Sequence, residues 1–139
     1  MTYLLDTHCI VWLLTKRESS LPGTVVDDIR YYANNYAVSE MSLVEIVQLQ
    51  QKGSIGMAPS PKELREKLEY LNIGVLPVSG RVIDTFYELP MPPQSDGKHS
   101  DPFDRVIIST AICNRRRLVS HDRRFVWYAN HYRLDLLYF

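Results

Sequence analysis

The sequence predicts an α/β domain in which a short parallel β-sheet lies between layers of helices. Two observations predict this class: short apolar runs alternate with amphipathic segments, and each amphipathic segment has apolar residues at helical spacing. The length of 139 residues is that of one domain, so residues 1–139 are expected to share a core. Ligands of such sheets bind at the carboxyl ends of the strands, where we expect the functional residues.

The first part of the chain predicts the order strand, helix, helix, strand. Residues 3–5 are an apolar run that ends at an acid, and Thr7 can then cap a helix whose apolar positions in residues 10–14 share a face. A second helix is expected at residues 22–33, because it starts with a proline suited to a first turn. Residues 36–38 form the second short apolar run and predict a buried strand.

Two helices are expected before the third strand. Ser39 or Ser42 can start the first, whose apolar stripe stops at Gly53, a typical residue after a helix end. Ser60 begins the second, which reaches about Leu71, because it is followed by a proline and an acid suited to the first turn.

The remaining elements follow the same alternation. We expect, in order, a strand at residues 75–78, a helix at 79–89, an exposed loop at 90–100, a helix from 101 to 112, and strands at 118–120 and 134–137. The loop is expected because Pro, Gly, Ser and charged residues crowd there, and the helix after it because Asp101 precedes a proline.

Composition excludes several classes of protein. Formal charges cancel, so nucleic-acid binding would have to rest on local clusters such as residues 115–117, although these arginines can equally complement a helix end. Cys9 and Cys113 lack the spacing of a zinc site or a disulfide framework and are interpreted as reduced core residues. The apolar stretch at residues 3–14 is too short to span a bilayer, so no membrane association and a cytoplasmic location are expected.

Four acids fall at one edge of the predicted sheet. Asp6 follows the first strand, Glu45 lies early in the helix after the second, Asp104 opens a late helix and Asp122 follows the fourth strand. Like charges gathered there would repel unless a cation neutralised them. Carboxylates without nearby Cys or paired His favour Mg²⁺ or Mn²⁺, which typically act on phosphate esters. The pattern therefore predicts metal-dependent phosphodiester hydrolysis.

Each acid also has a structural interpretation. Asp101 is better explained as an N-cap, and Asp104 could complete a capping box three residues later. Asp122 alone is more often a turn residue, and Asp6 could cap the helix that follows it. Glu45 is hardest to explain in this way, because its neighbours are all apolar.

Basic residues flank the proposed acid cluster. Arg105 follows Asp104, and Arg123 and Arg124 follow Asp122, so these arginines could contact a nucleic-acid backbone. A solvated charged surface is the more common outcome for such residues. The histidines near the acids match no zinc motif and are expected to be exposed or hydrogen-bonded: His8, His99 and His121.

Five segments of the sequence resemble PIN domains of the VapC type, the toxins of type II toxin–antitoxin pairs. The most specific is His99-Ser100-Asp101-Pro102-Phe103-Asp104-Arg105, which matches the HxDPFDR signature of one subgroup. The others are Leu5-Asp6-Thr7-His8 with Trp12, Val38-Ser39 leading to Glu45-Ile46 and Gly53, Leu76-Pro77-Val78, and Leu118-Val119-Ser120-His121-Asp122. The resemblance runs nearly from end to end of the chain.

The resemblance implies an endoribonuclease that uses Mg²⁺ or Mn²⁺. It implies that Thr7 and Ser120 orient carboxylates or water beside the metal, whose ligands would be the acids Asp6, Glu45, Asp104 and Asp122. It also implies an RNA substrate, a homodimer and a cognate antitoxin whose tail covers the active site. Composition and spacing show none of these partners.

Two departures from the subgroup favour an alternative. Leu49 stands where members often carry a Lys, and the loop at residues 91–98 is longer than usual. With the neutral charge, these features suggest a catalytically weak PIN module that acts as a binding or regulatory subunit. A response-receiver domain, which also holds Mg²⁺, ranks last because no strand offers the Lys that such a domain needs.

Overall fold

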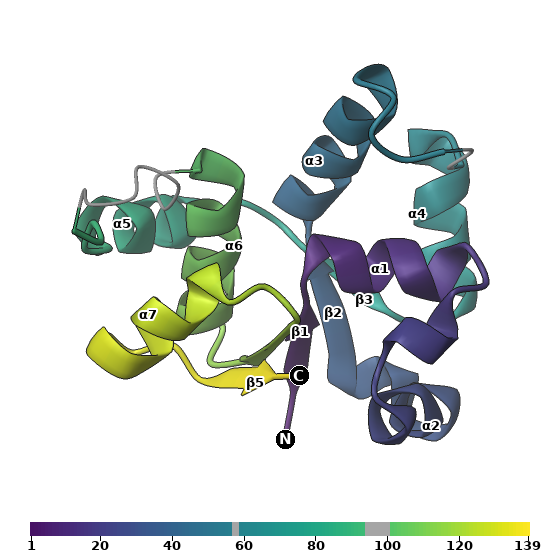
Figure 1. Ribbon diagram of the computed structural model, residues 1–139, viewed down its shortest axis with the longest axis horizontal. Helices are drawn as coiled ribbons and strands as arrows, with labels where there is room; N and C mark the ends of the chain where they lie inside the picture. Colours follow the sequence, from purple (N-terminus) through teal and green to yellow (C-terminus); the bar gives the residue numbers. More distant parts are fainter. Residues whose placement is uncertain (57–58, 94–100) are drawn as a thin grey trace.

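A computed structural model describes residues 1–56, 59–93 and 101–139. The described residues form a five-stranded sheet in the order β3-β2-β1-β4-β5, and every neighbouring pair is parallel (Figure 1). The strands are β1 (Tyr3–Leu5), β2 (Tyr36–Ser39), β3 (Gly74–Leu76), β4 (Arg117–Ser120) and β5 (Leu136–Tyr138). The predicted α/β class with a short parallel sheet is therefore confirmed.

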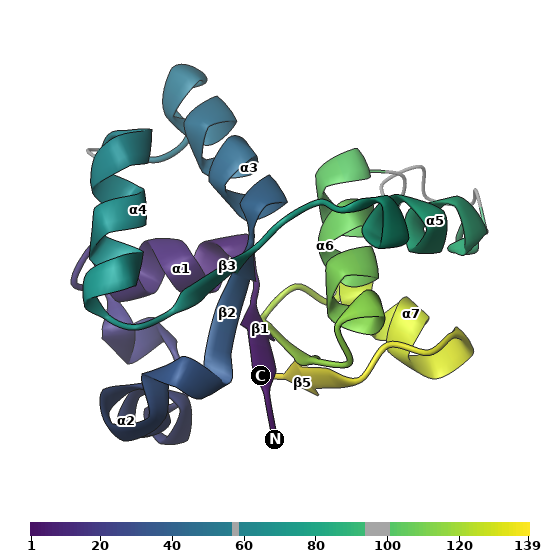
Figure 2. The ribbon, with the colours of Figure 1, turned by 180° about the vertical axis from the view of Figure 1, so that it is seen from behind.

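Helices cover both faces of the sheet. In the described ranges they are α1 (Thr7–Leu14), α2 (Gly23–Tyr32), α3 (Glu40–Gln51), α4 (Pro61–Tyr70), α5 (Gly80–Glu88), α6 (Pro102–Cys113) and α7 (Arg124–His131), with 3-10 turns at Glu18–Ser20 and Ala33–Asn35. Helices α1 to α4 lie on one side and α5 to α7 on the other (Figures 1 and 2). The link after β3 crosses from the first group to α5, as the view from behind shows (Figure 2).

Alternation of side chains along the strands divides the core into two parts. Leu5 and Val119 pack with buried residues of α1 to α4, whereas Leu4 and Leu118 pack with those of α6 and α7. These residues are fully buried, as expected for strands of a parallel sheet that is covered on both faces.

The strand register aligns the carboxyl ends of the central strands. Leu5 of β1 pairs with Val38 of β2 and with Val119 of β4. The backbone N–H of Asp6 then donates to the carbonyl oxygen of Val119 at 3.0 Å. The residues that follow these three strands therefore meet at one edge of the sheet.

Most helix starts agree with the sequence prediction. Ser39, Ser60 and Ser79 are N-caps whose side chains accept a backbone N–H in the first turn, and Asp101 does the same for α6. Gly53 has a φ of +70°, the left-handed conformation that follows many helix ends.

Other predictions need correction. The cap of α1 is not Thr7 but Asp6, as the structural interpretation of that acid predicted, because the Asp6 side chain accepts the backbone N–H of Thr7. The sequence did not predict α7, whose N-cap position, Arg123, makes no side-chain cap. Pro22 precedes the first turn of α2 as its N-cap. The outer strands are displaced by one or two residues from the predicted ranges, β3 toward the N-terminus and β5 toward the C-terminus.

Two further expectations concern the chain outside this core. The predicted loop at 90–100 is described only as far as residue 93, so His99, Ser100 and most of the long loop lie outside the described residues. Among the helices that the structure describes, none combines the length and apolar character needed to cross a membrane.

Candidate metal centre

Asp6 lies at the centre of the carboxyl edge, between β1 and α1. Its side chain is buried, with Oδ1 accepting from the backbone N–H of Thr7 at 2.7 Å and Oδ2 accepting from the Ser120 hydroxyl at 2.8 Å. Burial raises the pKa of Asp6, although these hydrogen bonds partly oppose the rise. The predicted supporting residue Ser120 therefore positions Asp6 directly.

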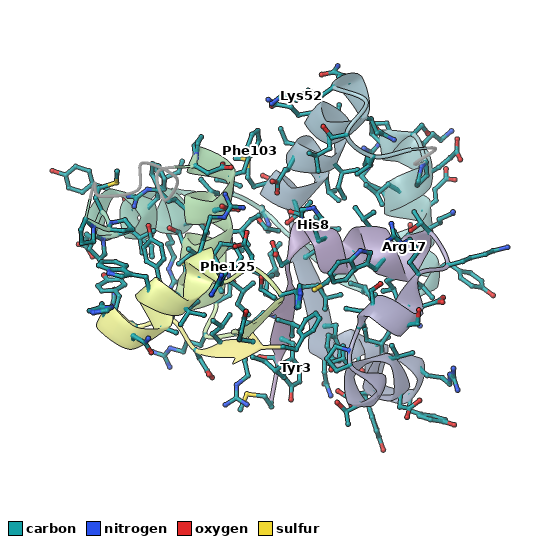
Figure 3. The ribbon with its side chains drawn as sticks, in the orientation of Figure 1. Tyr3, His8, Arg17, Lys52, Phe103 and Phe125 are labelled. Atoms are coloured by element: carbon teal, nitrogen blue, oxygen red, sulfur yellow. The ribbon has the colours of Figure 1, made fainter. Side chains whose placement is uncertain are left out.

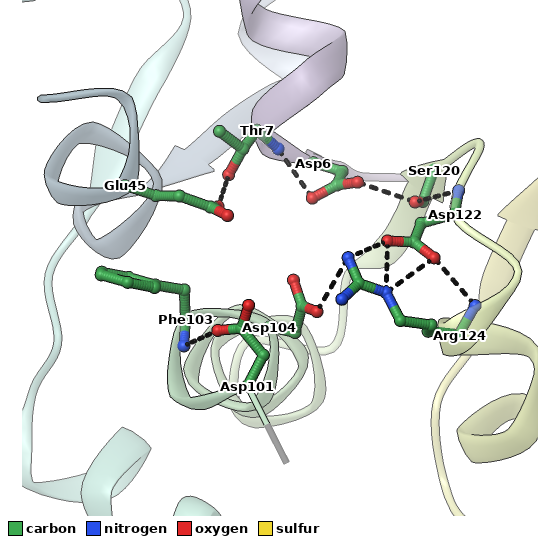
Figure 4. A network of polar contacts seen from close by, with 9 residues as sticks. All are labelled: Asp6, Thr7, Glu45, Asp101, Phe103, Asp104, Ser120, Asp122 and Arg124. Atoms are coloured by element: carbon green, nitrogen blue, oxygen red, sulfur yellow. Dashed lines mark hydrogen bonds and ion pairs between the residues drawn. The ribbon is translucent and has the colours of Figure 1, made fainter. Parts of the chain in front are cut away.

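Glu45 points toward the same edge from α3. Its Oε1 accepts a 2.5 Å hydrogen bond from the hydroxyl of Thr7, so Thr7 links the carboxylates of Asp6 and Glu45 (Figure 4). Burial raises the pKa of Glu45, and Asp6 and Asp101 add to the rise. This acid amid apolar neighbours is thus partly buried and hydrogen-bonded.

The first turn of α6 brings two more acids to this group. Glu45, Asp101 and Asp104 each offer one oxygen, and these three atoms all lie within 4.8 Å of one another. Asp101 is also the N-cap, since its Oδ1 accepts the N–H of Phe103 at 2.8 Å. Asp101 therefore combines the structural role that the sequence favoured with a place in the cluster.

Asp104 is the acid whose ionisation is most affected by this environment. Its pKa is raised to about 8, chiefly by burial; Arg124 opposes the rise, and the carboxylates of Asp101, Asp6 and Glu45 add to it. A carboxyl group that resists ionisation among other acids is a group that a cation would stabilise in its charged form.

Asp122 is placed differently from the other acids. Both of its oxygens accept hydrogen bonds from the Arg124 side chain, from Nε at 3.1 and 2.9 Å and from Nη2 at 2.5 Å (Figure 4). Burial raises the pKa of Asp122, but the bonds from Arg124 outweigh this and hold the pKa below its ordinary value. Asp122 reaches the predicted edge, yet an internal cation neutralises it.

The donor set fits a hard divalent ion. The three clustered side chains, Glu45, Asp101 and Asp104, offer only carboxylate oxygens, the ligands that Mg²⁺ and Mn²⁺ prefer. Asp6 is buried next to them and raises the pKa of Asp104, so its charge would also favour a cation. Among the residues that the structure describes, no Cys or His joins these three acids, which does not favour zinc.

Arg105 does not lie where an RNA-binding residue is expected. Its guanidinium is buried, donating to the carbonyl oxygens of Leu89 and Pro90 and to the hydroxyl of Tyr128, and it lies over the ring of Phe86. The predicted contact of Arg105 with an RNA backbone is therefore corrected to a role in packing, because its donors face inward.

The other arginines occupy different parts of the molecule. Arg123 is exposed at the start of α7. Arg116 donates to the carbonyl oxygen of Tyr3, which lies at the opposite end of β1 from His8 (Figure 3). The arginine cluster at residues 115–117 is thus at the edge of the sheet away from the acids, where Arg117 pairs with Asp135.

Sequence reasoning missed the pairing of Arg124 with Asp122 and the approach of Asp101 to Glu45. The contact between Arg124 and Asp122 depends on α7, which begins at Arg124. The sequence did not predict this helix, because no capping residue precedes it. The second depends on the packing of α6 against α3, which brings together residues 56 positions apart in the sequence.

Comparison with protein families identifies the fold. The model of the PIN domain matches residues 3–130, which include all the strands of the sheet except β5. The chain belongs to the PIN-domain family. This PIN domain thus carries its acids on the elements described above, and no curated protein matches its sequence.

Solved structures with the same fold come from VapBC systems. VapBC2 of Rickettsia felis, bound to a DNA fragment of the promoter, contains a chain 22% identical, with 99% of this chain and 98% of that chain covered and a TM-score of 0.67. VapBC-1 of nontypeable Haemophilus influenzae gives 19% identity, 99% and 98% coverage and a TM-score of 0.66. VapBC-5 of Mycobacterium tuberculosis, a member of the VapBC family of toxin–antitoxin systems, gives 16% identity, 99% and 98% coverage and a TM-score of 0.60. At these identities the likeness establishes the fold.

Proposed function

We propose that this PIN domain is an endoribonuclease that depends on Mg²⁺ or Mn²⁺. The observation that carries the proposal is the group formed by Glu45, Asp101 and Asp104, with oxygens within 4.8 Å of one another beside the buried Asp6. PIN domains are generally nucleases, and an all-carboxylate cluster suits the phosphodiester chemistry of hard divalent ions.

The residues around the cluster have distinct tasks in this proposal. Glu45, Asp101 and Asp104 would hold the ion, with Asp6 contributing negative charge from the buried side. When bound, the ion supplies positive charge that stabilises the anionic transition state and activates water. Thr7 fixes Glu45 and Ser120 fixes Asp6, so the carboxylates are held in place before the ion arrives.

The test is cleavage of RNA by the purified protein. We expect cleavage with Mn²⁺ or Mg²⁺, loss of cleavage with EDTA, and a rate at least about a hundredfold lower for Asp6→Asn, which keeps the shape but removes a buried charge. Asp84→Asn, a matched change at an exposed position of α5, should cut normally. Cleavage that persists in EDTA would refute the metal mechanism.

A wider role as the toxin of a toxin–antitoxin pair is supported by the VapBC structures that share this fold. In this role the chain would form a homodimer and bind a cognate antitoxin. Induced expression in a host without an antitoxin should slow growth, and the Asp6→Asn variant should not. Normal growth on induction of the unmodified protein would remove the toxin assignment while leaving the nuclease proposal standing.

The alternative of a catalytically weak binding module makes the opposite prediction for metal. Isothermal titration with Mn²⁺ distinguishes the two, because the nuclease proposal requires a bound ion at the acid cluster. If the protein folds but takes up no Mn²⁺ at neutral pH, the binding-module interpretation is favoured.

A further inference from the structure

Helix α7 places a cation inside the acid cluster. The Arg124 side chain leaves the first residue of α7 and reaches back to Asp122, and its Nη2 also lies 3.3 Å from Oδ2 of Asp104. The guanidinium thus lies between Asp122, which follows β4, and Asp104 of α6 (Figure 4). In the described part of the chain, the ion pairs at these acids come from Arg124 alone.

Hydrogen bonds from Arg124 occupy both carboxylate oxygens of Asp122. Oδ1 accepts from the backbone N–H and from Nε of Arg124, while Oδ2 accepts from Nε and Nη2. Charge-assisted hydrogen bonds of this kind, from a guanidinium to both oxygens of a carboxylate, are stronger than those between neutral groups. The three oxygens that lie within 4.8 Å of one another come from other residues, so a cation held by those three would not need Asp122 as a ligand.

The guanidinium also retains donors for a ligand. Within the described residues, Nε and Nη2 make the hydrogen bonds of the guanidinium and Nη1 has no hydrogen-bond partner (Figure 4). The Arg124 side chain is 37% exposed, so these donors are accessible to a molecule that enters the site. Because Asp122 engages Nε and Nη2, Nη1 is the nitrogen left to donate to a phosphodiester oxygen, and the positive charge of the guanidinium favours that anion.

We propose that Arg124 takes the part that a second metal ion would play. It neutralises Asp122, keeps that carboxylate out of the coordination of the ion, and binds the phosphodiester of the RNA beside the single ion held by Glu45, Asp101 and Asp104. This inference rests on the proposed function. It replaces the expectation that Asp122 is a metal ligand with a positioning role for Asp122, which orients Arg124.

The first experiment measures Mn²⁺ binding by isothermal titration. We expect one ion per chain for the unmodified protein and for Asp122→Asn, and no measurable binding for Asp104→Asn. Arg124→Ala should bind a second, weaker ion, because Asp122 is then available as a ligand. An Asp122→Asn protein that loses Mn²⁺ as completely as Asp104→Asn, an unmodified protein that binds two ions, or an Arg124→Ala protein that gains none would each overturn the proposal.

The second experiment measures binding of a labelled single-stranded RNA in EDTA, where no cleavage occurs by the proposed mechanism. Arg124→Ala should raise Kd by about tenfold and Arg124→Lys by about threefold, because lysine keeps the charge but loses the planar fork through which Asp122 orients the remaining donor. Arg30→Ala removes the same charge from an exposed position of α2 and should change Kd by less than about twofold.

Thermal unfolding of each variant checks that it folds. If Arg124→Ala does not fold, Arg124→Lys carries the test, and RNA affinity unchanged from the unmodified protein would contradict the proposal. The two proposals fail separately. An unmodified protein that binds no Mn²⁺ contradicts the nuclease function, whereas one that binds Mn²⁺ and cuts RNA but fails the comparison of variants contradicts only the role of Arg124.

Discussion

Two arginines next to acids in the sequence have opposite surroundings in the fold. Arg105 follows Asp104 on α6, but it points away from the cluster and its exposed fraction is only 7%. Arg124 follows Asp122 by two residues and reaches into the cluster while remaining partly exposed. Adjacency in a helix does not place side chains together, because successive residues are rotated by about 100° around the axis.

For Arg105 we expect a large effect on stability and none on RNA binding. Arg105→Ala should lower the free energy of unfolding by about 3 kcal/mol, because the carbonyl oxygens of Leu89 and Pro90 lose a buried donor. Urea denaturation measures this loss. Arg81→Ala, at an exposed position of α5, should change the free energy of unfolding by less than about 0.5 kcal/mol.

RNA affinity gives the second readout for Arg105. Where the Arg105→Ala protein is folded, its Kd for single-stranded RNA should equal that of the unmodified protein, since the guanidinium is buried and donates to Leu89, Pro90 and Tyr128. A weakened affinity without a loss of stability would restore the original prediction that Arg105 contacts RNA.

At the scale of elements, the start of α3 connects the two helices that carry the cluster. Ser39 is fully buried, its hydroxyl oxygen accepts the N–H of Met41 at 3.1 Å, and it lies 3.2 Å from the hydroxyl of Thr110 on α6. The cap therefore satisfies the first turn of α3 and contacts α6 at the same time. Glu45 and Asp104 are held on helices that share this contact.

We expect Ser39→Ala to lower the free energy of unfolding by about 1–2 kcal/mol, because both the helix cap and a buried hydroxyl contact are lost. Ser60→Ala is the matched control: it removes the cap of α4 at an exposed site and should cost about 0.5–1 kcal/mol. Chemical denaturation of both variants gives the comparison. Equal losses would show that the contact with Thr110 contributes nothing measurable.

At the scale of the whole molecule, the fold brings several carboxylates together in a partly buried site. Burial raises the pKa of Asp6, Glu45 and Asp104, so for each of these groups the protonated form is favoured by folding. Their contribution to stability is complete below their ordinary pKa near 4 and is lost as the pH rises, through about 8 for Asp104. Asp122 has a lowered pKa, so its contribution to stability changes with pH in the opposite direction: it is present at neutral pH and is lost in acid.

The metal-free protein should therefore lose stability as the pH rises. In EDTA we expect the Tm to fall by several degrees between about pH 5.5 and about pH 8.5, and saturating Mn²⁺ to restore it at the higher pH by neutralising the ionised acids. Differential scanning calorimetry measures both changes. Asp104→Asn, which removes the acid with a pKa of about 8, should show a smaller fall. A Tm in EDTA that is constant or higher at alkaline pH would contradict the placement of these acids.

Much of this arrangement could be predicted from the sequence. Short apolar runs and their alternation with capped amphipathic segments predicted the parallel sheet, and the position of Asp6, Glu45 and Asp104 after strands or at helix starts predicted a common edge. Local signals were sufficient here because caps such as Ser39 and Ser60 act within one helical turn, and strand direction fixes which ends meet.

Only the tertiary structure decided which side chains at that edge pair with one another. The sequence offered Arg105, Arg123 and Arg124 equally as partners of an RNA backbone, whereas the fold buries the first, exposes the second and joins the third to Asp122. The physical reason is that hydrophobic periodicity records which face of a helix is buried, while the contact of one charge with another depends on how α6 and α7 are rotated and packed.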